Sequence, residues 1–329
     1  MSLSALQLEV RRTGIGSSDI GAVAGLSPYA TPLDVWLVKR GLATVPETDA
    51  MRLGTALEPV IADLYGREHL AAGEMLRYPR DVAWPILVAA DTVRHPSEPW
   101  ILATPDRAVT VPRLAGEHPR EAPVRLVEIK SVAWRSAHHW GEAHDDVPAW
   151  YRAQIEWQML ATGVTRCDLA ALIGGAELRV YQIEHDPELA RMLVGIGRAF
   201  WRHVERGEEP PVDASESWRK HLETRFPRAV GEILPAGARA EEIAERLADA
   251  GARGAAAERD YDRAANELRA LIGDARGLKG TNWKATWSNA DGSPRWKDIA
   301  KELGADTRPD LVAKHTAAPS RRFTFTKGK

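Results

Sequence analysis

The chain has 329 residues, 44% of them apolar, and a net charge of −2, so it can bury a sizeable core and is not a polycation. No apolar run approaches the roughly 18 residues of a membrane span, and no basic stretch followed by an apolar one opens the chain, so we expect a cytoplasmic protein. One cysteine, Cys167, excludes a disulfide framework and a four-cysteine metal site.

Three helices are predicted within the first 64 residues. A turn of small residues at 13–19 opens a helix at 20–26, and a second helical pattern ends at Gly41. Leucines and an isoleucine at spacings of four, four and three predict a third helix over residues 53–64. Pro59 should lie in the first turn of that helix or kink it.

The middle of the chain is predicted to alternate strands with helices. Four strand-like runs cover residues 85–93, 100–104, 107–111 and 123–130. An amphipathic helix follows at 149–162, then two strands at 168–173 and 177–183 joined by Gly174-Gly175, and a helix at 187–206. This order predicts an α/β domain whose mixed central sheet is flanked by helices.

A Pro- and Glu-rich stretch at 208–211 predicts a boundary between a first domain, 1–212, and a C-terminal α+β region, 213–329. Residues 240–274 predict one or two long exposed helices, interrupted near 251–254, before a strand-rich end. The last 16 residues carry five Lys or Arg and no acid, which suits contacts with DNA phosphates at Arg321, Arg322 and Lys327. An ordinary solvated tail explains these charges equally well.

Two fragments 22 residues apart carry the most informative chemistry, Thr104-Pro105-Asp106 and Glu128-Ile129-Lys130. Side chains alternate along a strand, so Glu128 and Lys130 share one face. Two carboxylates suit Mg²⁺ or Mn²⁺, and a neighbouring lysine can orient or deprotonate a metal-bound water. Because about one Glu-x-Lys triplet is expected by chance in such a chain, the second carboxylate, Asp106, gives the pattern its weight.

Other polar residues fall near this pair in the predicted order of elements. Glu58 on the third helix and Gln154 on the helix after the strand can approach a metal or its water, although exposed helical polar residues are common. Arg12 and Ser18 bracket the small-residue turn, where backbone N–H groups, a hydroxyl and a guanidinium suit a terminal phosphate.

Three other chemistries are not supported. The Gly14-x-Gly16 pattern lacks a preceding strand and the third glycine of a dinucleotide site. His138, His139 and His144 fit no structural zinc spacing, so we expect them on a solvated loop. No Gly-x-Ser-x-Gly elbow of a serine hydrolase occurs.

With these pieces in order, the sequence resembles the YqaJ-type viral recombinases, relatives of phage lambda exonuclease in the PD-(D/E)XK nuclease superfamily. The resemblance lies in ordered segments between about residues 10 and 207. They are RTGIGSSD at 12–19, LGTALE at 53–58, TPD at 104–106, EIK at 128–130 and YRAQ at 151–154. The region after residue 212 has no counterpart in the smaller lambda enzyme.

The resemblance implies roles for individual residues. Asp106, Glu128 and the Ile129 carbonyl would bind Mg²⁺, with Mn²⁺ as substitute and two ions per site, and Glu58 is a further candidate ligand. Lys130 would activate the attacking water, positioned with the help of Glu58 and Gln154. The 5′-terminal phosphate of DNA would be bound by Arg12, Ser18 and Thr104.

We therefore expect a Mg²⁺-dependent exonuclease that digests one strand of duplex DNA from its 5′ end. It would leave a 3′ overhang for a single-strand annealing partner in a phage or prophage system of a bacterial host. The resemblance also implies a ring-shaped homotrimer. Two alternatives stay open: a structure-specific or restriction-type endonuclease of the same superfamily, and a non-catalytic DNA-binding recombination scaffold.

Overall fold

The computed structural model describes residues 10–70, 86–110, 123–289, 292–304, 307–316 and 324. The chain divides into two compact units, Met1–His221 and Leu222–Lys329, whereas the sequence suggests a boundary after residue 212. Among the described helices, none is long and apolar enough to cross a membrane.

The first unit is built on a five-stranded sheet with the order β1-β4-β5-β6-β7. These strands are β1 (Ile86–Ala89), β4 (Arg107–Thr110), β5 (Arg125–Val132), β6 (Arg166–Ile173) and β7 (Glu177–Glu184). β5 and β6 run parallel, and the other neighbours pair antiparallel. The predicted mixed sheet is confirmed. Two short strands, β2 (Val93–Arg94) and β3 (Leu102–Ala103), pair with each other in a separate ribbon.

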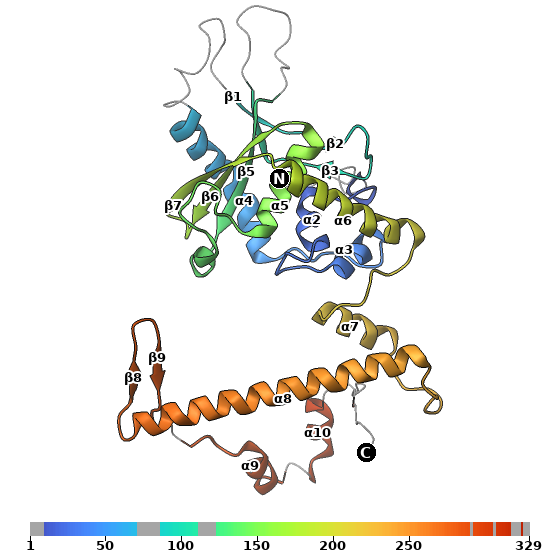
Figure 1. Ribbon diagram of the computed structural model, residues 1–329, viewed down its shortest axis with the longest axis vertical. Coiled ribbons are helices and arrows are strands. Elements are labelled where there is room, and N and C mark those ends of the chain that lie inside the picture. The colour runs from blue at the N-terminus through green and yellow to red at the C-terminus, as the bar shows by residue number, and fades with distance from the viewer. Residues whose placement is uncertain are drawn as a thin grey trace, which may run out of the picture. The chain divides into compact units, whose positions relative to one another are not determined.

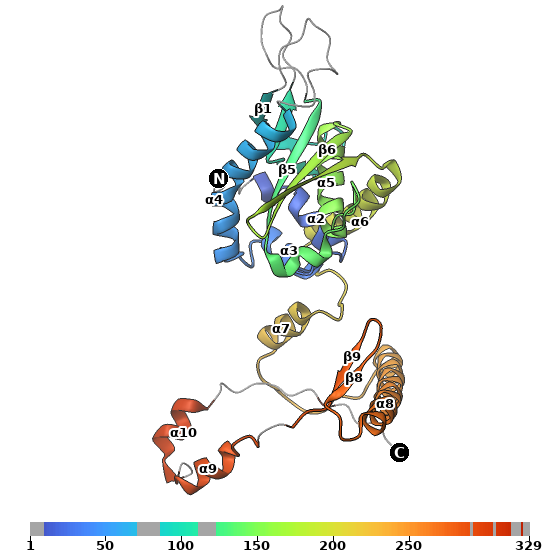
Figure 2. The ribbon, with the colours of Figure 1, turned by 90° about the vertical axis from the view of Figure 1, so that its left-hand side faces the viewer.

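Helices cover both faces of the sheet (Figures 1 and 2). α4 (Asp49–Tyr65), continued by η1 (Gly66–Leu70), packs on the face that carries Val127 and Ile129. α5 (Ala149–Thr162), preceded by η2 (Trp134–His139), packs on the face that carries Leu126. Because side chains alternate along β5, Glu128 and Lys130 face α5.

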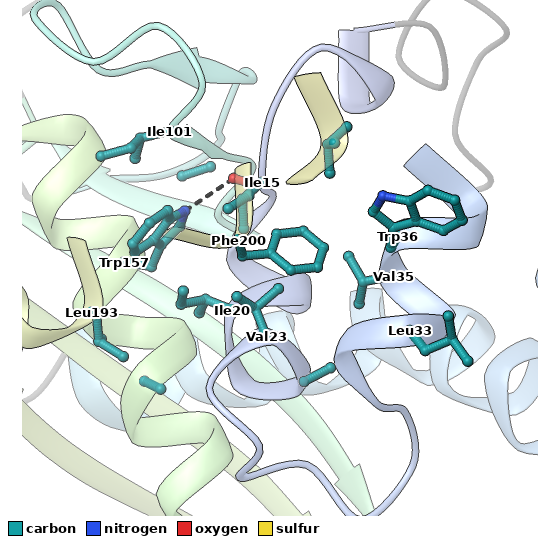
Figure 3. Packing of buried hydrophobic residues seen from close by; sticks show 14 of the residues in the cluster. Ile15, Ile20, Val23, Leu33, Val35, Trp36, Ile101, Trp157, Leu193 and Phe200 are labelled. Atoms are coloured by element: carbon teal, nitrogen blue, oxygen red, sulfur yellow. Dashed lines mark hydrogen bonds between the residues drawn. The ribbon is translucent and has the colours of Figure 1, made fainter. Parts of the chain in front are cut away.

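A further helical layer packs on the side of α5 that faces away from the sheet. It consists of α2 (Ser17–Val23), α3 (Pro32–Lys39) and α6 (Pro187–Arg206). Trp157 of α5 is fully buried between them and donates its indole N–H to the Ile15 carbonyl at 3.0 Å (Figure 3). This bond fixes the turn before α2 to the helix that also faces the sheet.

The structure decides two points about the helices that the sequence left open or predicted wrongly. α4 begins at Asp49, so Pro59 lies in the helix interior and not in its first turn. In the second unit, α8 (Ala238–Ile272) runs unbroken, so the predicted interruption near 251–254 is wrong. A glycine in an exposed helix costs only about 1 kcal/mol relative to alanine, which a 35-residue helix can absorb.

The remaining elements are short. α7 (Glu216–Arg225) spans the division between the units, and its Trp218 is buried in the core of the first. The second unit also holds the hairpin β8 (Gly277–Lys279) and β9 (Lys284–Thr286), then α9 (Trp296–Glu302) and α10 (Pro309–His315). The predicted strand near 283–287 and helix near 296–303 are confirmed.

Candidate active site

Asp106 and Glu128 are brought together where β4 and β5 diverge. The last pair of the β4–β5 ladder is Arg107 with Val127, so Asp106 follows in register opposite Glu128. Beyond that pair the Ile129 N–H has no ladder partner on β4, and it donates instead to Asp106 Oδ2 at 2.8 Å. The Asp106 carboxylate thus replaces the backbone carbonyl that a continued β4 strand would offer to the Ile129 N–H.

Glu128 is 2% exposed and lies in a set of hydrogen-bond donors. Lys130 Nζ and Gln154 Nε2 each lie 2.5 Å from Glu128 Oε1, and Gln158 Nε2 lies 2.7 Å from Glu128 Oε2. Gln154 and Gln158 are four residues apart on α5 and therefore share the helix face turned to the sheet. Three donors hold a carboxylate that offers about four lone-pair sites.

Lys130 is the cation of the site. Its ammonium lies 2.5 Å from Glu128 Oε1 and 5.0 Å from the centre of the Tyr151 ring. Burial disfavours the charge, but Glu128 and Asp106 outweigh it and raise the pKa of Lys130 above its ordinary value. At neutral pH Lys130 is therefore a charged donor.

Asp106 has the opposite electrostatic situation. Burial, together with the nearby Glu128 carboxylate, raises its pKa to about 7, and the Lys130 charge opposes this rise only in part. Two carboxyl groups close to a single ammonium leave the site short of positive charge.

The donor set fits a hard divalent cation. In the described part of the chain, no three His, Cys, Asp or Glu side chains group closely enough to hold a metal. The oxygen ligands that this site can offer a cation are therefore the carboxylates of Asp106 and Glu128 and the Ile129 carbonyl. Asp106 keeps its second oxygen, Glu128 keeps one lone-pair site, and the Ile129 carbonyl belongs to the same residue whose N–H Asp106 accepts. Oxygen donors of this kind suit Mg²⁺.

Glu58 does not join this set directly. Its Oε1 lies 2.7 Å from Arg107 Nη1, so the carboxylate is paired with an arginine at the start of β4. Its charge still adds to the repulsion that raises the pKa of Asp106.

The small-residue turn is held against the strand that leads to Asp106. The Ile15 N–H donates to the Trp100 carbonyl at 2.6 Å, and the Leu102 N–H donates to the Ile15 carbonyl at 3.0 Å. A side chain at Gly14 would place its Cβ 2.4 Å from the Trp100 oxygen, so only glycine fits.

The arginine that reaches Ser18 is Arg11. Its guanidinium donates to Ser18 Oγ, while Arg12 is exposed to solvent. Thr104, which precedes the Asp106 segment, shares a hydrogen bond of 2.9 Å with Thr92. The predicted phosphate contacts of Arg12, Ser18 and Thr104 stay predictions.

Residues 7–165 match the family model of the YqaJ-like viral recombinase domain. This stretch, just under half of the chain, is similar to the YqaJ-like viral recombinase family. The YqaJ protein of Bacillus subtilis (strain 168) is 28% identical over 221 residues, which cover 66% of this chain and 61% of that protein's own length.

Two solved structures are similar at lower identity. An alkaline exonuclease from Laribacter hongkongensis is 19% identical with a TM-score of 0.44, over 67% of this chain and 97% of that one. A phage-related exonuclease from Haemophilus somnus 129PT is 11% identical with a TM-score of 0.39, over 59% of this chain and 94% of that one.

The matched YqaJ-like stretch contains every catalytic residue predicted from the sequence and, besides Arg11, three polar residues that were missed. Gln158 completes the donors around Glu128, Arg107 binds Glu58, and Lys39 binds Asp19 at 2.6 Å beside the small-residue turn. A signal existed for Gln158, because it follows Gln154 by one helical turn. The predicted DNA contacts at Arg321, Arg322 and Lys327 lie outside the described residues.

Proposed function

We propose that this protein is a Mg²⁺-dependent DNA exonuclease of a phage-type recombination system. The observation that supports it best is the arrangement of Asp106, Glu128 and Lys130, in which the two carboxylates and one ammonium meet at the diverging ends of β4 and β5. A glutamate held by three donors in a nearly inaccessible position is costly to maintain for stability alone. Such an arrangement is typical of a site that stabilises the negative charge on a reacting phosphate group.

The metal would be held by Asp106, Glu128 and the Ile129 carbonyl, with Mn²⁺ able to replace Mg²⁺. A divalent cation bound there supplies Lewis-acid stabilisation of phosphate charge and a water of lowered pKa. A second ion would need Glu58, which must first leave Arg107.

The protein side chains would divide the remaining work. Lys130 donates to the attacking water or to a phosphate oxygen and so orients them, because its raised pKa keeps it charged. Gln154 and Gln158 hold the Glu128 carboxylate in one orientation.

Engagement of a 5′ end would fall to the small-residue turn. Arg11 presents its guanidinium at Ser18, and the same turn is bonded to β3, which leads to Thr104 and Asp106. We include Arg11 beside the predicted Arg12, Ser18 and Thr104 as a phosphate contact. Digestion from that end would leave a 3′ overhang for an annealing partner, and a ring-shaped trimer would keep the enzyme on its strand.

The test is cleavage of end-labelled linear duplex and of covalently closed circular duplex in Mg²⁺. We expect loss of label from the linear DNA alone; equal cutting of the circle would favour the endonuclease alternative. Glu128→Ala and Lys130→Ala should each abolish cleavage, whereas Glu205→Ala, an exposed glutamate of α6, should leave it unchanged.

Metal binding distinguishes the nuclease from the alternative of a non-catalytic DNA-binding scaffold. Titration of Mg²⁺ or Mn²⁺ without DNA should show saturable binding that Asp106→Ala removes. If the protein neither binds metal nor cuts DNA, the scaffold alternative is the better one.

The basic C-terminal end would add contacts with the DNA backbone. Replacing Arg321, Arg322 and Lys327 together by alanine should reduce the slope of log affinity against log salt concentration by about 3, since each duplex phosphate contact contributes roughly 0.9. An unchanged slope would remove these residues from the DNA-binding surface.

A further inference from the structure

A continuous group of aromatic rings extends from Lys130 to the surface of the first unit. The group, called the aromatic ledge below, consists of Tyr29, His138, His139, Trp150 and Tyr151. The Tyr151 ring centre lies 5.0 Å from Lys130 Nζ and 5.6 Å from the Trp150 ring. Trp150 in turn contacts Tyr29 and His139, with ring centres 6.2 Å and 5.7 Å away. His138 stands 3.9 Å beyond His139.

The ledge is assembled from three segments that also build the candidate active site. Tyr29 follows α2, which begins at the small-residue turn. His138 and His139 end η2, the first element after β5 and Lys130. Trp150 and Tyr151 form the first turn of α5, one turn before Gln154. The rings therefore lie where three segments meet: the small-residue turn with α2, β5 with Lys130, and α5 with Gln154.

The inner and outer rings of the ledge differ in exposure. Tyr29 is 74% exposed, and His138 and His139 are also exposed. Trp150 is held, because its Cβ and backbone lie 3.1 to 3.4 Å from where a Cβ on Gly21 would be. An exposed tyrosine set edge-on against a fixed tryptophan, with an interplanar angle of 89°, keeps ring surface available to a ligand.

Largely exposed rings gain little from folding, so their position needs another explanation. Aromatic side chains beside a phosphodiester site are suited to nucleobases, because each base has a flat face that stacks on a ring whatever its sequence. Bases inside a duplex already stack on one another and are paired, so only unpaired bases have a face to offer.

We propose that the aromatic ledge binds unpaired bases of the DNA strand whose phosphate enters the Lys130 site. This inference rests on the proposed nuclease function and adds a substrate class to it. The ledge favours ends whose terminal nucleotides are unpaired or easily opened, since stacking on Tyr29 compensates for the lost base pair. Tyr29 is then the outermost stacking contact, and Tyr151 the one nearest to the reacting phosphate.

A binding experiment on the full-length protein in EDTA tests the ledge without cleavage. The probe is a duplex with a few unpaired nucleotides at one end, one of them the fluorescent base 2-aminopurine, which is quenched when it stacks on an aromatic ring. We expect quenching on binding by the wild-type protein. Tyr29→Ala should lose most of the quenching and bind about tenfold more weakly, and Tyr29→Phe should behave as wild type.

The matched control is Trp134→Ala. Trp134 is 75% exposed, as open as Tyr29, and its ring packs at Gly174 in the β6–β7 turn, apart from the ledge contacts. It should change neither quenching nor affinity. Equal loss in Trp134→Ala and Tyr29→Ala, or no loss in Tyr29→Ala, would overturn the ledge.

Cleavage in Mg²⁺ separates this inference from the function on which it rests. Wild type should cut the frayed duplex faster than a blunt duplex, and Tyr29→Ala should reduce that preference while it still cuts both. If wild type cuts DNA ends and Tyr29→Ala prefers the frayed duplex as strongly as wild type does, the binding of bases by the ledge is refuted while the nuclease function stands. A wild-type protein that neither binds nor cuts DNA ends refutes the nuclease function and the ledge with it.

Discussion

Replacing Asp106 by asparagine should make the metal-free protein more stable, although it removes a proposed metal ligand. Burial and the neighbouring Glu128 raise the pKa of Asp106 from 3.8 to about 7. Between these values the folded protein holds a proton that the unfolded chain has released, so the free energy of unfolding falls as the pH rises. The penalty is absent well below pH 4 and complete above pH 7.

The size of the effect follows from the pKa of Asp106. At pH 8 the ionised carboxylate lowers the free energy of unfolding by about 4 kcal/mol, and at pH 5 by about 2 kcal/mol. An asparagine side chain at this position cannot ionise, yet its carbonyl can still accept the Ile129 N–H. The free energy of unfolding of Asp106→Asn should therefore be higher than that of wild type, by about 2 kcal/mol at pH 5 and about 4 kcal/mol at pH 8.

Hydrogen exchange of amides in β5 and β6, measured in EDTA, reports unfolding of the first unit separately from the second. Asp145→Asn, in an exposed loop, is the control and should change the free energy by less than about 0.5 kcal/mol at either pH. Added Mg²⁺ should stabilise wild type at pH 8 and narrow its gap to Asp106→Asn. A gap that stays constant between pH 5 and pH 8 would refute the account of the Asp106 charge.

Three further changes probe the supports of the site. Gln158→Ala should slow cleavage about 10- to 100-fold in a single-turnover assay with little loss of DNA affinity, because Glu128 loses an orienting donor. Gly14→Ala should lower the midpoint of thermal unfolding, costing about 1–3 kcal/mol, since its Cβ would meet the Trp100 carbonyl. Lys39→Met removes the ammonium that pairs with the partly buried Asp19 carboxylate, which keeps only its bond from the Gly16 N–H, and should destabilise by about 3 kcal/mol in chemical denaturation. Equal stability in either of the last two variants would contradict the packing described.

The sheet and its central site were predictable because their signals are local. Alternation along β5 places Glu128 and Lys130 on one face without knowledge of the rest of the chain. The hairpin of β6 and β7 was marked by Gly174-Gly175 and appears as expected. Both patterns depend only on neighbours within a few residues.

The missed contacts depend on which of several similar side chains turns inward. Arg11 and Arg12 are adjacent, and a sequence pattern cannot decide which one reaches Ser18; the structure places Arg11 there. The sequence offers Glu58 only as a further candidate ligand, and it does not indicate the pairing with Arg107, 49 residues away, that the structure contains. Such choices are made by tertiary packing.

The parallel pairing of β5 with β6 has a consequence for biosynthesis. Glu128 depends on donors from α5, and β5 is completed on its other edge by β6, which ends at Ile173. A nascent chain that has left the ribosome only as far as Lys130 holds every carboxylate of the site but neither of the glutamines that orient Glu128. The site therefore cannot take its final form on the growing polypeptide until the strand beyond α5 has emerged and docked.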